Sequence, residues 1–253
     1  GTGLNPMRGQ NNIQGAGDVG AVPSNYPGFQ PVENPESKEK FEKLYGREMD
    51  AEKGITKVRA LEASGKSIFA MLIDGENTVV SDPDRSHCEK ALKSLDHLVV
   101  IDIFLTETAE LADVVLPATA WAETDGVCTN TERRVQRLRQ AVPPPGQAKP
   151  DWWIISQIAK RLGFDGFEFD SAKDIFEELC SLSPIYAGLD WDRIELGAYQ
   201  WPVPDKNHPG TPILHQNEFK NGLGIFKVIG YRDPAETTSN SFPIWLTTGR
   251  RLQ

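Results

Sequence analysis

The sequence predicts an α/β fold with a doubly wound, mainly parallel sheet and an irregular C-terminal segment. Three apolar runs rich in β-branched residues, Ile68–Ile73, Leu98–Ile101 and Val114–Leu116, have the length and composition of buried strands. Segments with helix-capping residues lie between these runs, so strands and helices alternate along the chain. This alternation is typical of a parallel sheet that helices cover on both faces.

The helices are predicted from capping residues and apolar periodicity. Asp82 followed by Pro83 suits a helix start, because aspartate is a favoured N-cap and proline fits the first helical position. Asp151 is expected to cap a later helix, and Ser171 with Asp174 forms a capping box. The predicted helices are Glu36–Tyr45, Ile55–Ala63, Asp82–Leu95, a short crossover after Thr106 or Thr108, Trp152–Leu162 and Ser171–Leu182. On the Trp152–Leu162 helix, the expected buried side chains are Trp152, Ile155, Ile158 and Leu162.

The C-terminal part of the chain carries weaker signals. Residues 184–240 contain many Pro, Gly and Asn, which predicts irregular structure and leaves room for one hairpin around Gly224. Phe242–Thr247 is expected to be a strand that enters a new unit, and Thr248-Gly249-Arg250 is the turn after it.

Composition excludes several classes of protein. The chain of 253 residues has a net charge of −9 and no Lys/Arg run, which argues against a nucleic-acid binder. No apolar stretch approaches membrane-spanning length. Cys88, Cys128 and Cys180 have no CxxC or CxH spacing, so no local zinc or iron–sulfur ligand set is predicted. Isolated cysteines suit reduced thiols and a cytoplasmic location.

Polar residues at two strand ends are candidate ligand contacts. Asp102 follows the Leu98–Ile101 strand, and the turn Asp74-Gly75-Glu76-Asn77 follows the first strand. Ligands in open α/β sheets bind beyond the carboxyl ends of the strands, so we expect a ligand at Asp102 and its threonines. An ordinary turn that needs Gly75 remains the alternative for the first strand end.

Two polar clusters leave their role open. Arg8–Asn12 places a guanidinium and three amides in five residues, which suits a pocket whose arginine binds a small carboxylate. From the residues alone, turn residues that satisfy the local backbone are the preferred interpretation. Residues 123–134 carry three acids and two arginines, which suit an internal ion-pair network or an anionic ligand.

Five motifs in one order resemble a known family. They are NPMRGQNNIQGAGDVG, IDIFLTETAELADVVLPATAW, ETDGVCTNTERRVQR, PDWWIISQIAKRLG and WLTTGRRLQ. Together they closely resemble the catalytic subunit of molybdenum- or tungsten-dependent formate dehydrogenases of the dimethyl sulfoxide reductase family. The resemblance implies reversible two-electron oxidation of formate to CO2 at a bis(molybdopterin guanine dinucleotide) centre with Mo or W. Formate and iron–sulfur or electron-acceptor subunits are the implied partners.

The resemblance also implies roles for single residues. Arg8 is expected to orient formate, and a guanine is expected near Asp102 and Asp151, since a carboxylate accepts from both N1–H and the exocyclic amine. The implied cofactor-binding residues are Gln10, Gly75, Glu76, Asn77, Asp102, Thr106, Asp151 and Arg250. Thr78 replaces the proline that usually follows the Gly-Glu-Asn turn. No metal ligand is expected in this chain.

The implied organisation is that of an internal fragment, inactive alone, with the 4Fe-4S cysteines and the metal-ligating Cys or selenocysteine upstream. Its expected parts are an active-site-proximal polar segment at 1–36, an α/β guanine-dinucleotide domain at 37–183, an irregular linker at 184–240 and the start of a C-terminal cofactor domain at 241–253. The alternatives are another molybdopterin oxidoreductase, such as a nitrate reductase, and a non-catalytic iron–sulfur scaffold like that of complex I. Arg8 favours formate, and the intact cofactor residues argue against a scaffold.

Overall fold

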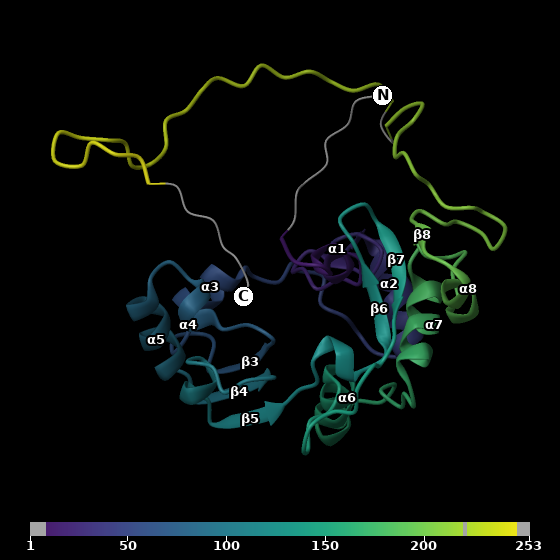
Figure 1. Ribbon diagram of the computed structural model, residues 1–253, viewed down its shortest axis with the longest axis horizontal. Coiled ribbons are helices and arrows are strands. Elements are labelled where there is room, and N and C mark those ends of the chain that lie inside the picture. The colour runs from purple at the N-terminus through teal and green to yellow at the C-terminus, as the bar shows by residue number, and fades with distance from the viewer. Residues whose placement is uncertain (1–8, 220–221, 247–253) are drawn as a thin grey trace. The chain divides into compact units, whose positions relative to one another are not determined.

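A computed structural model of the chain describes residues 9–219 and 222–246. The chain divides into two units, Gly1–Thr211 and Pro212–Gln253, and each is described by itself. The helices and strands assigned to the described residues belong to the first unit (Figure 1). Before the parallel sheet these elements are α1 (Ile13–Asp18), β1 (Asn25–Tyr26), β2 (Gln30–Pro31), α2 (Pro35–Tyr45) and α3 (Lys57–Ala63).

A parallel sheet of β3 (Ala70–Asp74), β4 (His97–Asp102) and β5 (Val114–Pro117) confirms the predicted fold class. The strand order β3-β4-β5 follows the chain order. Leu72 lies opposite Val99, and Val99 lies opposite Val114. Because the strands are parallel, their carboxyl ends meet at one edge of the sheet.

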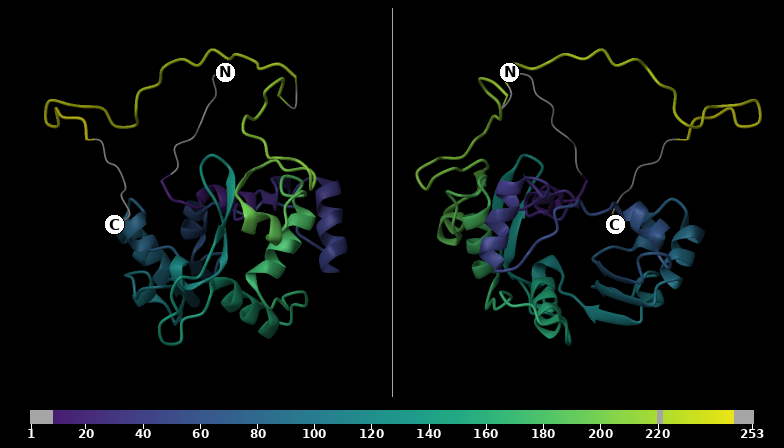
Figure 2. Two further views of the ribbon diagram at one scale, coloured as in Figure 1. Left: turned by 45° about the vertical axis from the view of Figure 1, so that its right-hand side comes forward. Right: turned by 180° about the vertical axis from the view of Figure 1, so that it is seen from behind.

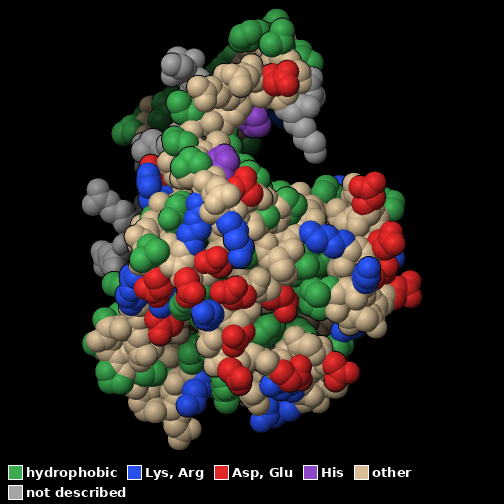
Figure 3. All heavy atoms as spheres, turned by 90° about the vertical axis from the view of Figure 1, so that its right-hand side faces the viewer, with side chains coloured by type: hydrophobic (Ala, Val, Ile, Leu, Met, Phe, Trp, Pro, Cys, Tyr) green, Lys and Arg blue, Asp and Glu red, His purple; other side chains and the backbone are tan. Residues whose placement is uncertain are grey.

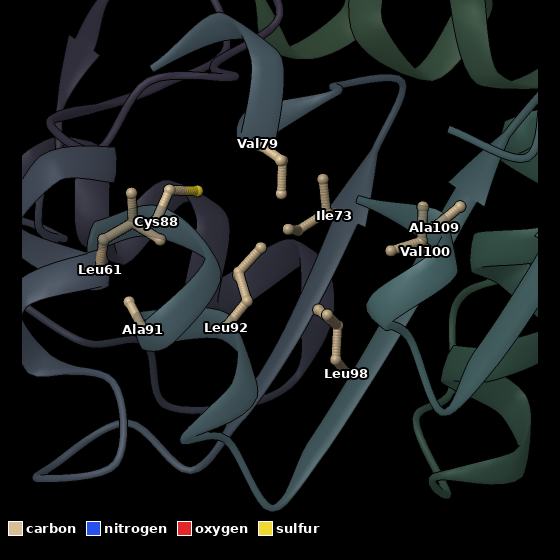
Figure 4. Packing of buried hydrophobic residues seen from close by; sticks show 9 residues of the cluster. All are labelled: Leu61, Ile73, Val79, Cys88, Ala91, Leu92, Leu98, Val100 and Ala109. Carbon is tan, nitrogen blue, oxygen red and sulfur yellow. The ribbon is translucent and has the colours of Figure 1, made fainter. Parts of the chain in front are cut away.

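One face of this sheet packs on α3, α4 (Thr78–Ser81), α5 (Arg85–Lys93) and the 3-10 turn η1 (Ala109–Leu111). Figure 4 shows the side chains of these elements directed toward β3 and β4. The buried cluster comprises Leu61, Ile73, Val79, Cys88, Ala91, Leu92, Leu98, Val100 and Ala109. The opposite face carries Ile101, which packs against Ile154 of α6 (Asp151–Arg161). Helices therefore cover parts of both faces, as a doubly wound sheet requires.

Two helix predictions at this sheet are wrong in detail. Asp82 does not cap α5, because it ends the short helix α4 and pairs with Lys57 at 2.9 Å. The cap of α5 is Asp84, whose carboxylate accepts from the backbone N–H of His87 at 2.9 Å. The predicted crossover helix shrinks to the single turn η1, because β5 already begins at Val114.

Helix α6 follows the predicted range but turns a different face to the core. Ile154 is buried, whereas Ile155 and Leu162 are exposed, contrary to the prediction. The reason is tertiary, since Ile154 packs with Ile101 of β4. Asp151 is the first helical residue rather than the cap. The capping box predicted for α7 (Ala172–Leu182) is confirmed.

An antiparallel sheet of β6 (Gly126–Thr129), β7 (Arg134–Leu138) and β8 (Tyr199–Gln200) lies next to α7 and α8 (Trp191–Leu196) (Figures 1 and 2). The elements α8 and β8 fall in the region 184–240 that was predicted to be irregular. Tyr186, Ile194 and Val203 of this region are buried, so its aromatic and aliphatic residues form a core despite the prolines and glycines.

The second unit contains little regular structure among its described residues. Phe219 and Gly222 form an isolated antiparallel bridge near the predicted hairpin. The strand predicted at Phe242–Thr247 is not formed over the described residues 242–246, because no ladder partner lies beside it there.

On the face of the molecule that carries α7 and α8, acidic and basic side chains are interspersed (Figure 3). The polar set at residues 123–134 contributes ion pairs, such as Arg134 with Glu132 at 2.8 Å and Arg137 with Asp125 at 3.0 Å. The internal network is therefore the interpretation that the contacts support. Among the helices described, none is both long and apolar enough to cross a membrane.

Candidate functional site

The carboxyl edge of the parallel sheet gathers three aspartates. Asp74 ends β3, Asp102 ends β4, and Asp151 begins α6. The loop before α6 reaches this edge because the backbone N–H of Lys149 donates to the carbonyl of Pro117 at 3.1 Å. A ligand contact was expected at Asp102 from its place at a strand end and at Asp151 from the family resemblance, and the charges of both act on Asp74 at this edge.

The three carboxyl groups interact electrostatically. Burial raises the pKa of Asp74 to about 6, and the charge of Asp151, a hydrogen bond to it and the charge of Asp102 contribute to this rise in pKa. The pKa of Asp151 is also raised, first by burial and in part by the charge of Asp102. Because burial and like charge disfavour the charged forms of Asp74 and Asp151, a ligand that donates hydrogen bonds here would stabilise the carboxylates. A ligand edge with two N–H donors, such as that of guanine, fits this set.

Asp102 also shapes the chain where β4 ends. Its Oδ1 accepts from the backbone N–H of Ile103 at 2.7 Å and of Phe104 at 3.3 Å. The side chains of Ile103–Leu105 are exposed. Thr106 is half-buried, and its Oγ1 accepts from the N–H of Ala109 at 3.2 Å. Asp102 and Thr106 therefore frame one short loop at the sheet edge.

The turn after β3 is held by side chains from other elements. Gly75 has φ of +63°, which favours glycine, and its N–H donates to the carbonyl of Ile101 at 2.9 Å. Glu76 pairs with Lys57 at 3.3 Å and accepts from the hydroxyl of Ser81. The side chains of this turn thus have structural contacts. The space above Gly75 is open, because no atom of the described residues beyond its chain neighbours lies within 4 Å of the position that a Cβ would take.

Asn77 joins the two loops that face the ligand edge. Its Oδ1 accepts from the hydroxyl of Thr108 at 2.8 Å, and its Nδ2 donates to Glu107 at 2.8 Å. The Thr108 hydroxyl in turn accepts from the N–H of Val79 at 3.0 Å. The side chain of Asn77 therefore connects the two loops. Its oxygen and nitrogen both take part in these hydrogen bonds, so the predicted cofactor contact falls to its backbone.

Gln10 lies half-buried just before α1, where its carbonyl accepts from the N–H of Ile13 at 3.5 Å. Gln10 belongs to a segment far from the sheet edge in sequence, and no hydrogen bond joins it to the three aspartates within the described part of the chain. Arg8 and Arg250 lie outside the described residues. Among the described residues, no group of three or more His, Cys, Asp or Glu could hold a metal ion.

Asp74 was expected in the ligand-facing turn after the first strand but was not included among the cofactor-binding residues. The signal was present, because Asp74 ends the first strand as Asp102 ends the second. The register pairs Asp74 with Ile101, the neighbour of Asp102, which brings the two carboxylates to adjacent strand ends.

Comparison with known proteins gives consistent matches. A family model described as molybdopterin oxidoreductase matches residues 1–161. The alpha subunit of an F420-dependent formate dehydrogenase from Methanocaldococcus jannaschii is 51% identical over 253 residues, which cover 99% of this chain and 37% of that protein. Formate dehydrogenase H from Escherichia coli is 39% identical, over 99% of this chain and 36% of that protein.

A solved structure supports the fold. Acetylene hydratase from Pelobacter acetylenicus superimposes with a TM-score of 0.51 at 19% sequence identity, over 72% of this chain and 29% of that chain. The chain spans little more than a third of the length of the curated relatives named above, since it covers 37% and 36% of them.

Proposed function

Because this chain belongs to the molybdopterin oxidoreductase family, we propose that it works within the catalytic subunit of a formate dehydrogenase. The reaction is the reversible oxidation of formate to CO2, which releases two electrons and one proton. The metal centre, Mo or W held by bis(molybdopterin guanine dinucleotide), supplies the two-electron redox chemistry when it is bound. The names of the relatives at 51% and 39% identity support this reaction.

The observation that carries the proposal is the set of carboxylates at the sheet edge. Asp74, Asp102 and Asp151 lie where α/β sheets bind ligands, and the pKa values of Asp74 and Asp151 are raised by burial and by neighbouring negative charge. A guanine base supplies two adjacent N–H groups, so we propose that Asp102 and Asp151 bind the guanine of one dinucleotide arm. Thr106 belongs to the same loop as Asp102 and is proposed to contact the guanosine.

The remaining proposed roles rest on the family resemblance. Gln10 contacts the pterin, and Arg250 binds the pterin or its phosphates. The open space above Gly75 suits a close approach of the cofactor to the backbone of the Gly75–Asn77 turn. Arg8 orients formate, because a guanidinium pairs with a carboxylate through two parallel hydrogen bonds.

We propose that the protein acts with an electron-acceptor subunit and a 4Fe-4S cluster held outside this chain. The relatives' description as alpha subunits supports an assembly with other subunits. A cytoplasmic location stays a prediction. The free thiols of Cys88, Cys128 and Cys180 suit it.

The test is substrate oxidation by the full-length protein purified with its metal and cofactor. We expect formate-dependent reduction of a redox dye and no reduction of nitrate. Arg8→Ala should raise KM for formate and lower kcat, whereas Arg59→Ala, which changes an exposed arginine, should leave both unchanged. Nitrate reduction would instead support the nitrate reductase alternative. A full-length protein without metal or redox activity would support the scaffold alternative, and wild-type kinetics in metal-loaded Arg8→Ala would refute the role of Arg8.

A further inference from the structure

A buried carboxylate outside the sheet edge anchors the segment that contains Gln10. Asp18, at the end of α1, has no exposed surface. Its Oδ2 accepts from the hydroxyl of Tyr186 and from the indole N–H of Trp201, both at 2.7 Å. Its Oδ1 accepts from the side-chain amide of Gln14 at 2.8 Å. Asp18 thereby joins α1 to residues 168 and 183 positions further along the chain.

Burial makes these bonds strong determinants of where α1 lies. A buried carboxylate is costly unless donors surround it, and the end of a helix adds partial negative charge. Burial and the charge of Asp18 raise the pKa of Tyr186 far above its usual range, so its hydroxyl remains a donor. The guanidinium of Arg133 interacts with the charge of Asp18 and stacks over the Trp201 ring at 5.2 Å.

The start of α1 is fixed on the same elements. The Oδ1 of Asn12 accepts from the backbone N–H of Thr129 in β6 at 2.8 Å. The hydroxyl of Thr129 forms a hydrogen bond of 2.8 Å with Tyr186, which links the two ends of α1 through one tyrosine. A Cβ at Gly15 would clash with the Oδ1 of Asn12 and lie 3.2 Å from the nitrogen of Thr129, so a side chain here would displace the hydrogen bond between Asn12 and Thr129.

We propose that Asp18 is a positioning residue for the loop Gly9–Asn12, and that through this loop it holds Gln10 against the pterin of the cofactor. This inference rests on the proposed function. It goes further, because it attributes the fixed position of the loop to the buried carboxylate of Asp18. The loop runs directly into α1, whose two ends are held by Asn12 and Asp18. Only one residue separates Gln10 from Asn12, so the position of Asn12 restricts the position of Gln10.

A purely structural role would give a different result from a positioning role. A structural residue, when changed, destabilises the whole unit, whereas a positioning residue releases α1 and the loop first. The two roles are separated by measuring local opening and cofactor retention beside global stability. Ile194 is a suitable control site, because it is buried in α8 and takes no part in the hydrogen bonds described above for Asn12 and Asp18.

The experiment uses the full-length protein and the variants Asp18→Asn, Tyr186→Phe and Ile194→Ala. Hydrogen exchange is measured at residues 9–18 in the cofactor-free form. For the loaded form, the pterin that stays bound per polypeptide after gel filtration is measured. In Asp18→Asn the negative charge that strengthens the bonds from Tyr186 and Trp201 is lost and one accepting oxygen becomes a donor, so we expect exchange at residues 9–18 to rise about tenfold or more. Pterin retention should fall at least about threefold. Tyr186→Phe should give a smaller rise in the same segment.

Ile194→Ala should lower global stability without selective exchange at residues 9–18. The proposal is overturned if Asp18→Asn keeps wild-type exchange there, or if its exchange rises no more than that of Ile194→Ala. It is also overturned if exchange rises but the pterin is fully retained. If Asp18→Asn does not fold, Tyr186→Phe decides by the same criteria. Because exchange is measured without cofactor or substrate, a wild-type protein that fails to oxidise formate refutes the proposed function separately.

Discussion

Replacing Asp74 by Asn should make the stability of the protein less dependent on pH. Burial and the neighbouring charges of Asp151 and Asp102 raise the pKa of Asp74 to about 6 in the folded protein. The folded state therefore holds a proton on Asp74 more tightly than the unfolded chain does. This group contributes stability fully below its unfolded pKa, and the contribution is lost as pH rises through about 6.

The magnitude follows from the shift and from the exposure of the side chain. Each pKa unit corresponds to about 1.4 kcal/mol, so the full shift would correspond to about 3 kcal/mol. Asp74 as a whole is exposed at the end of β3 although its carboxyl group is partly desolvated, so solvent screens these interactions. We therefore expect Asp74→Asn to be about 1 kcal/mol more stable relative to wild type at pH 7.5 than at pH 4.5.

The assay is urea unfolding of the wild-type and variant proteins at several pH values between 4.5 and 7.5. Asp165→Asn, which removes a carboxylate from an exposed loop, corrects for the loss of one negative charge. A difference between Asp74→Asn and wild type that stays constant across this range would refute the reasoning. It would mean that folding does not raise the pKa of Asp74.

Three further substitutions, the first with a matched control, test the packing and bracing of the first unit. Leu98→Ala should cost about 3 kcal/mol of folding stability, measured by thermal or urea unfolding, because Leu98 is 1% exposed. The control Leu72→Ala, on the more open face, should cost less than about 1 kcal/mol. Equal costs would contradict the assigned core. Asn77→Ala should cost about 2 kcal/mol by the same measurement, since it leaves the buried Thr108 hydroxyl without its acceptor, and an unchanged midpoint would contradict the bracing role. Arg137→Ala should cost about 2 kcal/mol of folding stability, because its ion pairs and ring stacking are lost. Salt should change this cost little, because the guanidinium is mostly buried. A cost that disappears in salt would contradict this account of Arg137.

The sequence predicts the sheet well because its signals are local. An apolar run that ends on an acid predicted β4 and placed Asp102 at its carboxyl end, as found. The first strand was predicted two residues early, because Ile68 and Phe69 are apolar although the ladder begins at Ala70 opposite His97. An apolar run indicates a strand, but the adjacent strand decides at which residue the pairing begins.

Features that depend on distant partners were beyond prediction. Helix α6 has apolar residues on more than one face, and only its contact with Ile101 selects Ile154 as the buried one. Asp18 lies in a polar, glycine-rich segment, and nothing near it in sequence predicts a buried carboxylate. Its donors Tyr186 and Trp201 lie in a region that looked irregular. Tertiary packing overrides local propensity at both places.

The most direct test of the account is the identity of the nucleotide that the full-length protein carries. Acid hydrolysis of the purified, cofactor-loaded protein should release GMP together with a pterin. In the double variant Asp102→Asn, Asp151→Asn the amount of GMP should fall, since both proposed guanine acceptors are changed. Release of CMP or of no nucleotide, or undiminished GMP in the double variant, would contradict the claim that the aspartates at the sheet edge bind guanine.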